Sequence, residues 1–150
     1  MSEHIIKSHN KTLLLYHLVF PVKYRRGVIK EELGETIKAI GLEISERYEI
    51  HFVEIGADED HVHYMVQSVP KLSVTEIVTT IKSITAREIF ERHPEIRQRL
   101  WGGHFWTSGY YANTVGRYGN EFLIQQYVKE QGKKYDRIYR GQLTMFEGLS

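Results

Sequence analysis

The spacing of hydrophobic residues changes several times along the chain, and three of its stretches predict β-strands. Residues 12–20 (TLLLYHLVF) form a dense apolar and aromatic run that stops at Pro21, which is typical of a buried strand. Residues 50–57 and 61–69 alternate between apolar and polar positions on either side of the acidic turn 58–60. This arrangement predicts that the second and third strands pair in an antiparallel hairpin.

In two other stretches apolar residues recur at steps of three and four, which predicts helices. The first stretch is 29–48, and the second follows the capping-box pair Ser73 and Glu76 and continues to about His93, before Pro94. The apolar positions are Ile29, Leu33, Ile37, Ile40 and Ile44 in the first helix, and Val74, Ile77, Val78, Ile81 and Ile84 in the second.

The last third of the chain predicts a fourth strand and a third helix. Residues 101–115 (WGGHFWTSGYYANTV) are rich in glycine and aromatic side chains, which favours an irregular strand with a bend or bulge at Gly109. Residues 120–131 indicate a helix that is closed by Gly132.

The predicted order is β-α-β-β-α-β followed by an extra C-terminal helix. This order is typical of an α+β, ferredoxin-like split β-α-β fold, in which right-handed crossovers place both main helices on one face of a four-stranded antiparallel sheet. We expect the opposite face to be free for a ligand or a partner.

Composition narrows the class of protein. The chain has 150 residues, 41% apolar and 26% charged, which fits one globular domain. Because it has no cysteine, any metal must be held by histidine, carboxylate or amide groups. It shows no apolar run long enough to span a membrane and no signal-peptide pattern, so we expect a cytoplasmic protein.

The overall charge gives little attraction for nucleic acid, because 20 basic residues face 19 acidic ones for a net charge of +1. Two local clusters are more basic. They are Lys23, Arg25 and Arg26, and the later group Lys129, Lys133, Lys134, Arg137 and Arg140. Either cluster taken alone is more simply explained as a solvated face.

Two histidines flank Val62 on a predicted strand. Side chains alternate with period two along a strand, so His61 and His63 point to the same face while Val62 and Tyr64 point to the other. The apolar side chains should face the helices, which places both imidazoles on the open face. A lone His-x-His pair is as consistent with surface histidines as with a metal site.

The predicted C-terminal helix offers a possible nucleophile. Tyr127 and Gln131 are four residues apart and share a helical face, one carrying a hydroxyl and the other an amide oxygen. A phenol with a pKa near 10 needs help at neutral pH, and a divalent cation that polarises the electrophile supplies part of it.

These motifs together resemble the single-tyrosine HUH transposases, the TnpA proteins of small bacterial and archaeal insertion sequences. The resemblance covers about residues 10–135. Its motifs are His61-Val62-His63, the Tyr127-to-Gln131 helix, Tyr16-His17-Leu18-Val19-Phe20 followed by Lys23-Tyr24-Arg25-Arg26, and the Trp-Gly…Phe-Trp…Tyr…Thr-Val-Gly pattern within 101–116.

The resemblance implies a metal-dependent strand transferase that acts on single-stranded DNA. Tyr127 would attack a backbone phosphate, form a 5′-phosphotyrosine link and release a 3′-OH, with no nucleotide cofactor. The matching His61, His63 and Gln131 would hold Mg²⁺ or Mn²⁺.

The resemblance also implies a homodimer in which the tyrosine helix of one subunit completes the histidine site of the other. Gly116 and Gly119 would allow that helix to swing, or would simply turn the chain. The DNA ends would be imperfect hairpins. Phosphate contacts would come from Lys23, Arg25, Arg26, Lys133 and Lys134, and base stacking from Tyr24 or Tyr110, whereas Phe105 and the tryptophans are better explained as core residues.

Other function classes fit less well. A histidine-triad hydrolase would require a third histidine where this chain has Met65. Replication initiators and relaxases share the chemistry but carry further domains. A non-enzymatic, ferredoxin-like nucleic-acid-binding module remains an alternative, as does a domesticated HUH nuclease that processes repeats. The sequence does not identify the hairpin, the target site or the physiological metal.

Overall fold

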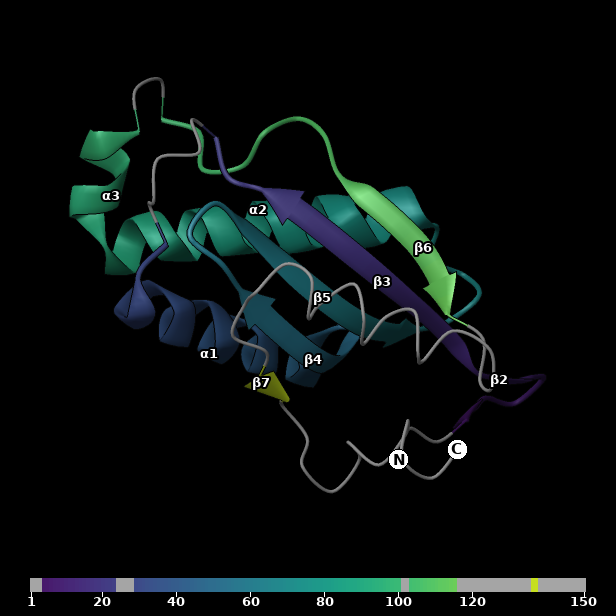
Figure 1. The fold of residues 1–150 in the computed structure, drawn as a ribbon. Coiled ribbons are helices and arrows are strands. Elements are labelled where there is room, and N and C mark those ends of the chain that lie inside the picture. The colour runs from purple at the N-terminus through teal and green to yellow at the C-terminus, as the bar shows by residue number, and fades with distance from the viewer. Residues whose placement is uncertain (1–3, 24–28, 101–102, 116–135, 138–150) are drawn as a thin grey trace.

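The structure is a computed structural model that describes residues 4–23, 29–100, 103–115 and 136–137. Its main sheet is antiparallel with the strand order β6-β3-β5-β4-β7 (Figure 1). The strands are β3 (Leu14–Pro21), β4 (His51–Ala57), β5 (His61–Ser68), β6 (Tyr111–Val115) and β7 (Asp136–Arg137). The predicted four-stranded sheet is confirmed, and β7 adds a fifth strand of two residues at the β4 edge.

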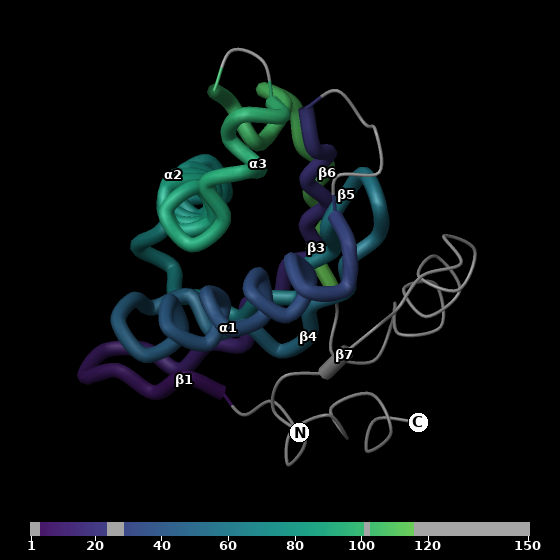
Figure 2. Tube along the Cα trace, turned by 90° about the vertical axis from the view of Figure 1, so that its left-hand side faces the viewer, coloured from purple at the N-terminus to yellow at the C-terminus, as the bar shows by residue number. Residues whose placement is uncertain are grey.

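Two long helices, α1 (Glu31–Arg47) and α2 (Val74–Arg92), cover one face of this sheet. Figure 2 views the arrangement from the side and shows both helices on the same side of the strands. The main core fills the space between these layers, with members such as Phe20, Ile37, Phe52, Tyr64 and Ile81. The predicted α+β architecture and the shared placement of the main helices are therefore confirmed.

Local sequence features explain where the helices begin and how closely they pack. At the start of α2, the Ser73 hydroxyl accepts from the Glu76 backbone N–H at 3.0 Å, and the Glu76 carboxylate accepts from the Ser73 N–H at 2.8 Å. This confirms the predicted capping box. In α1, Gly41 lets the helix approach β4, because a Cβ placed there would lie 2.5 Å from Cδ1 of Ile55.

Besides β7, three short elements were not predicted. The strands β1 (Ile5–Ile6) and β2 (Lys11–Thr12) form a separate antiparallel hairpin near the N-terminus. The helix α3 (Pro94–Arg99) follows α2 directly, with Pro94 in its first turn. A proline that ends one helix is also well suited to begin the next, because its ring fixes a helical φ and the first helical N–H needs no partner.

The expected irregular strand over 101–115 is confirmed in the described part of that segment. Residues 111–115 form β6, and upstream of it Trp106 makes an isolated antiparallel bridge with Val22, just beyond the end of β3. The ladder is interrupted between these two pairings, where residues 107–110 lie opposite only residues 20–21, and Gly109 lies within this bend, as predicted. Lys82 holds the bend by donating to the carbonyls of Thr107 and Gly109 at 2.8 and 2.9 Å. A second irregularity lies in β4, between Phe52 and Glu54.

Several predicted features lie outside the described residues, among them the C-terminal helix 120–131 and Gly116 and Gly119. Within the described part of the chain, no helix has both the length and the apolar character that crossing a membrane would require.

Candidate active site

The strand β5 places His61 and His63 at the centre of the sheet, between β3 and β4. His63 is directly opposite Val19 of β3 and Gly56 of β4, so on one side its neighbour has no side chain. The alternating residues Val62 and Tyr64 belong to the core beneath the helices. The predicted division of this strand, apolar side chains toward the helices and histidines away from them, is confirmed.

The face that carries the histidines is more enclosed than expected. Four of its apolar side chains form a second buried cluster, consisting of Leu15, Val53, Met65 and Val115. His63 is 1% exposed, whereas the side chain of His61 is 16% exposed. The expectation of a free face is therefore wrong for its centre, and of the two predicted histidines His61 is the more accessible.

The two predicted histidine ligands are neighbours in space. The ring centroids of His61 and His63 are 4.8 Å apart, and the ring planes meet at 62°. The expectation that both rings lie side by side on one face of the strand is therefore confirmed, whereas their joint binding of a metal stays a prediction.

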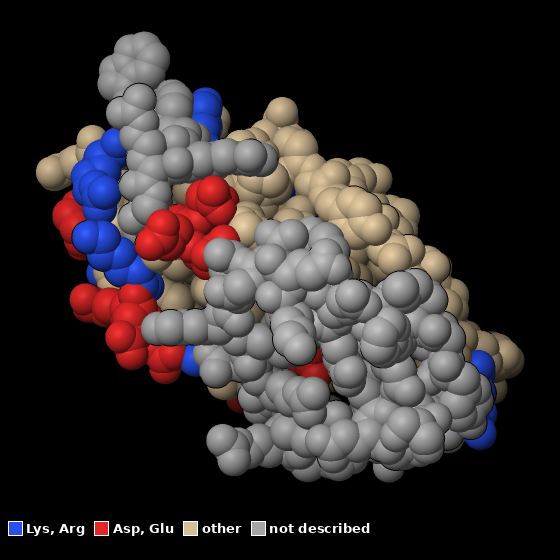
Figure 3. Space-filling model, in the orientation of Figure 1, with Lys and Arg blue, Asp and Glu red and all other residues tan. Residues whose placement is uncertain are grey.

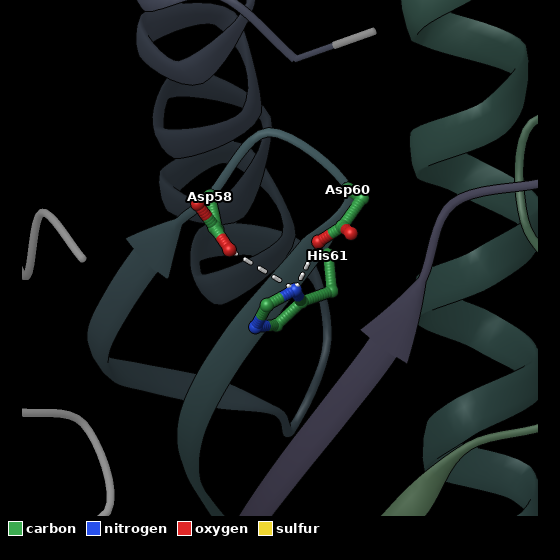
Figure 4. A group of neighbouring side chains, drawn as sticks. All are labelled: Asp58, Asp60 and His61. Atoms are coloured by element: carbon green, nitrogen blue, oxygen red, sulfur yellow. Dashed lines mark hydrogen bonds and ion pairs between the residues drawn. The ribbon is translucent and has the colours of Figure 1, made fainter. Parts of the chain in front are cut away.

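The acidic turn before β5 fixes the orientation of His61 (Figure 4). Nδ1 of His61 is 2.6 Å from Oδ1 of Asp60 and 3.3 Å from Oδ2 of Asp58. Since a carboxylate only accepts, Nδ1 is the nitrogen that donates, and in a neutral imidazole the lone pair then lies on Nε2. Nε2 is buried and has no hydrogen-bond partner among the described residues. Metal-binding histidines are commonly oriented in this way.

This turn is also a possible metal-binding group in its own right. Ligand atoms of Asp58, Asp60 and His61 all lie within 4.8 Å of one another. In Figure 3 acidic side chains gather over the turn between β4 and β5, while the described surface over β6 is uncharged. A phosphate that approached His61 would meet negative charge unless a cation lay between them.

The sequence pattern marks Asp58 and Asp60 only as turn residues and indicates no role for His17. The sequence feature that could have indicated a role for the two carboxylates is their closeness to His61, since Asp58 is three residues and Asp60 one residue before it. His17 lies on β3, is 3% exposed, and stacks on His63 with a centroid distance of 5.8 Å and an interplanar angle of 12°. Burial lowers the pKa of His17 to about 4, so this imidazole is neutral at physiological pH.

The structure tests few of the predicted DNA contacts. Lys23 lies in the described part of the chain, and its backbone N–H donates to the Phe105 carbonyl at 2.8 Å. Phe105 and Trp106 are 1% and 7% exposed, which confirms them as core residues, whereas Tyr110 is 42% exposed. The predicted residues outside the described ranges are Tyr24, Arg25, Arg26, Tyr127, Gln131, Lys133 and Lys134.

Comparison with known protein families decides the class of protein. Residues 10–131 match the family model described as "Transposase IS200 like". The chain belongs to the IS200-like transposases. The resemblance inferred from the sequence motifs is thereby confirmed.

Individual IS200-like transposases are similar over most of this chain. The ISDra2 transposase TnpA of Deinococcus radiodurans is 31% identical over 121 residues, which cover 81% of this chain and 86% of that protein. The transposase of insertion sequence IS200 from Salmonella typhimurium is 29% identical over 124 residues, covering 83% and 80%.

Solved structures agree with the IS200-like fold. The crystal structure of a candidate transposase from Deinococcus radiodurans R1 matches with a TM-score of 0.70 and 28% identity, covering 85% of this chain and 97% of that chain. A REP-associated tyrosine transposase bound to a REP hairpin matches with a TM-score of 0.52 and 7% identity, covering 97% and 76%. At that identity the second likeness concerns the fold alone.

Proposed function

We propose that this transposase cleaves and rejoins single-stranded DNA at the ends of an insertion sequence, through a covalent 5′-phosphotyrosine intermediate on Tyr127. The observation that carries the proposal is the paired imidazoles of His61 and His63, with Nδ1 of His61 held by carboxylates and Nε2 buried without a hydrogen-bond partner among the described residues. Surface histidines without a function have no need of such an arrangement.

A divalent cation fits these residues. The imidazole nitrogens of His61 and His63 suit Mn²⁺, and the amide oxygen of Gln131 suits Mg²⁺ as well. We assign these three residues as the ligands and Asp60 as the partner that orients His61, with Asp58 close enough to contribute. When bound, the cation polarises the scissile phosphate and offsets the charge of the acidic turn.

Tyr127 is the proposed nucleophile. Its phenolic oxygen loses its proton and bonds to phosphorus, the bond from phosphorus to the 3′ oxygen breaks, and that oxygen takes up a proton and leaves as a 3′-OH. The phosphodiester energy is kept in the tyrosine link, so a second 3′-OH can attack it and join a new strand. No nucleotide cofactor is needed for either step.

The proposed substrate is single-stranded DNA with hairpin ends. The fold neighbour that is bound to a REP hairpin agrees with this substrate class. Phosphate contacts are assigned to the basic residues of the two sequence clusters, Lys23, Arg25, Arg26, Lys133 and Lys134, with Tyr24 beside them.

We further propose a homodimer with composite sites, in which one subunit supplies the histidines and the other supplies Tyr127. Heterodimers of Tyr127→Phe and His63→Ala protein test this arrangement, because each mixed dimer then contains one intact site and one doubly damaged site. Cleavage should return in a single turnover. Persistent inactivity in verified heterodimers would show that each subunit uses its own tyrosine.

The decisive test of the chemistry uses an oligonucleotide that carries the DNA flanking the protein's own gene. With Mg²⁺ or Mn²⁺, the wild-type protein should form a covalent adduct with the single strand and none with the matched duplex. Tyr127→Phe is the matched variant, because it removes only the hydroxyl. It should bind the DNA and form no adduct.

An adduct on the Tyr127→Phe protein would place the nucleophile elsewhere. Equal cleavage of the duplex would contradict the single-strand assignment. Binding of the oligonucleotide without cleavage under any metal would favour the non-enzymatic binding module.

A further inference from the structure

His17 is a buried histidine that the proposed chemistry does not use. It lies on β3, on the same face of the sheet as His63, and is 3% exposed. In the strand register His17 is opposite Met65 of β5, while Val19 is opposite His63. His17 is therefore a diagonal neighbour of His63, at a separation that ring side chains can bridge.

The rings of His17 and His63 are nearly parallel. Their centroids are 5.8 Å apart and their planes differ by 12°, in contrast to the 62° between His61 and His63. On its other side, His17 meets the ring of Tyr111 edge-on at 6.3 Å and 74°. His17 is thus held between a tyrosine from β6 and a histidine from β5.

The register also shows from which direction His17 contacts its neighbour. Along β5, His61 lies two residues before His63, and Met65, which is paired with His17, lies two residues after it. The ring of His63 therefore has His61 on one side and His17 on the other. Rotation of the His63 ring would open the stacked contact.

From this arrangement we propose that His17 is a positioning residue, whose ring stacks on His63 and fixes the plane in which that imidazole presents its nitrogen to a metal ion. This inference rests on the proposed function, because it gives His63 the role of ligand. It adds a support for His63 that matches the support His61 receives from Asp60. Each of the two histidines then has a neighbour that helps to set its orientation.

The test is calorimetric titration of Mn²⁺ into wild-type protein and three variants. His17→Ala removes the ring, His17→Phe keeps a flat ring without nitrogens, and Leu15→Ala deletes an equally buried side chain on the same strand and face. We expect His17→Ala to weaken Mn²⁺ binding by about 10- to 100-fold, the range found when a supporting partner of a metal ligand is lost. His17→Phe and Leu15→Ala should keep wild-type affinity, although Leu15→Ala should lower the melting temperature.

A second readout needs no metal. The Cε1–H resonance of His63, assigned with a His63→Ala variant, should shift and broaden in His17→Ala protein, because a neighbouring ring and a fixed orientation are lost together. Leu15→Ala should leave this resonance unchanged.

The two readouts separate this inference from the function on which it rests. If wild-type protein fails to bind Mn²⁺, the proposed metal site is wrong, and the His63 resonance alone decides whether His17 positions the ring. The inference is overturned if His17→Ala retains both wild-type affinity and the wild-type resonance. It is also overturned if Leu15→Ala has the same effects, or if His17→Phe loses as much affinity as His17→Ala.

Discussion

Thr85 accepts the indole N–H of Trp106 at 2.8 Å, and both side chains are buried. The Thr85 hydroxyl in turn donates to the carbonyl of Ile81 one turn earlier in α2, at 2.6 Å. One hydroxyl therefore joins α2 to the loop that precedes β6. It also provides the hydrogen bond that a buried tryptophan needs.

Replacing this hydroxyl should destabilise the protein. We expect Thr85→Val to lower the free energy of unfolding by about 1–3 kcal/mol, because the indole N–H would stay buried without an acceptor. Thr85→Ser keeps the hydroxyl and should lose less. Urea denaturation of the three proteins measures the difference, and equal stability of Thr85→Val and wild type would show that the bond contributes nothing net.

Two glycines of α1 should respond in opposite ways to alanine. At Gly41 a Cβ would lie 2.5 Å from Cδ1 of Ile55, which is 1% exposed, so Gly41→Ala should cost about 1–3 kcal/mol through overpacking. At Gly34 the nearest contact would be an ordinary 3.7 Å to Cβ of Ala57. Gly34→Ala should therefore gain up to about 1 kcal/mol from helix propensity. Thermal unfolding of both variants tests the contrast, and two variants of equal stability would contradict the close packing at Gly41.

The carboxylate of Asp60 should matter more for metal affinity than that of its neighbour Glu59. Asp60 accepts from Nδ1 of His61 at 2.6 Å, whereas Glu59 is exposed. Asp60→Ala should weaken Mn²⁺ binding by about 10- to 100-fold, because His61 loses the partner that fixes its protonated nitrogen. Glu59→Ala removes the same charge from the same turn and serves as the control. If the two variants lose affinity equally, the effect comes from overall charge and not from orientation.

The carboxylate of Glu49 connects the N-terminal hairpin to the start of α2. It pairs with Lys7 and with Lys71, and these two ammonium groups lower its pKa from 4.5 to about 2. Because the pKa of this acid is lower in the folded state, its contribution to stability is present above about pH 4.5 and is lost as the pH falls toward 2.

The contribution should be small and sensitive to salt, since the partners are exposed. We expect wild type to melt slightly above Glu49→Gln at pH 7 and low ionic strength, with the difference in melting temperature narrowing as the pH is lowered to 3. A gap that stays constant with pH would show that the charge of Glu49 is not responsible.

The hydroxyl of Tyr64 is expected to be dispensable. The side chain is fully buried between Phe20 and Phe52, its hydroxyl has no hydrogen-bond partner among the described residues, and burial raises its pKa above the usual range. Tyr64→Phe removes a polar atom that was desolvated without compensation, so stability should stay the same or rise by about 1 kcal/mol. A loss of more than that in chemical denaturation would reveal a partner for the hydroxyl.

The sequence predicted which face each residue of β5 occupies, because a period of two leaves only two choices and the apolar set decides between them. It did not predict the contact between His17 and His63. That contact depends on the register between β3 and β5, and a shift of two residues would keep every side chain on its face yet separate the rings. Register is set by pairing across the whole sheet, which no local pattern encodes.

The roles of Asp58 and Asp60 were missed for a related reason. Acidic residues in a turn are typical of solvent-exposed loops, and only the turn geometry directs both carboxylates toward His61. Similarly, Gly109 indicated the interruption between β6 and the Trp106 bridge, whereas the irregularity between Phe52 and Glu54 has no glycine to indicate it. The alternation of side chains along β5 predicted that the two histidines share a face. The groups that orient them come from other parts of the fold, which the alternation does not describe.

The pairing of Glu54 with Arg137 joins positions separated by more than half of the chain's length, through a strand of only two residues. So short a strand contributes few hydrogen bonds to the sheet, so β7 should be among the first strands to open. Amide exchange should be faster at the β4–β7 ladder than at the β3–β5 ladder. His61 and His63 are on β5, which keeps a strand on each side when β7 leaves. Opening at this edge can therefore proceed while the histidines keep their geometry.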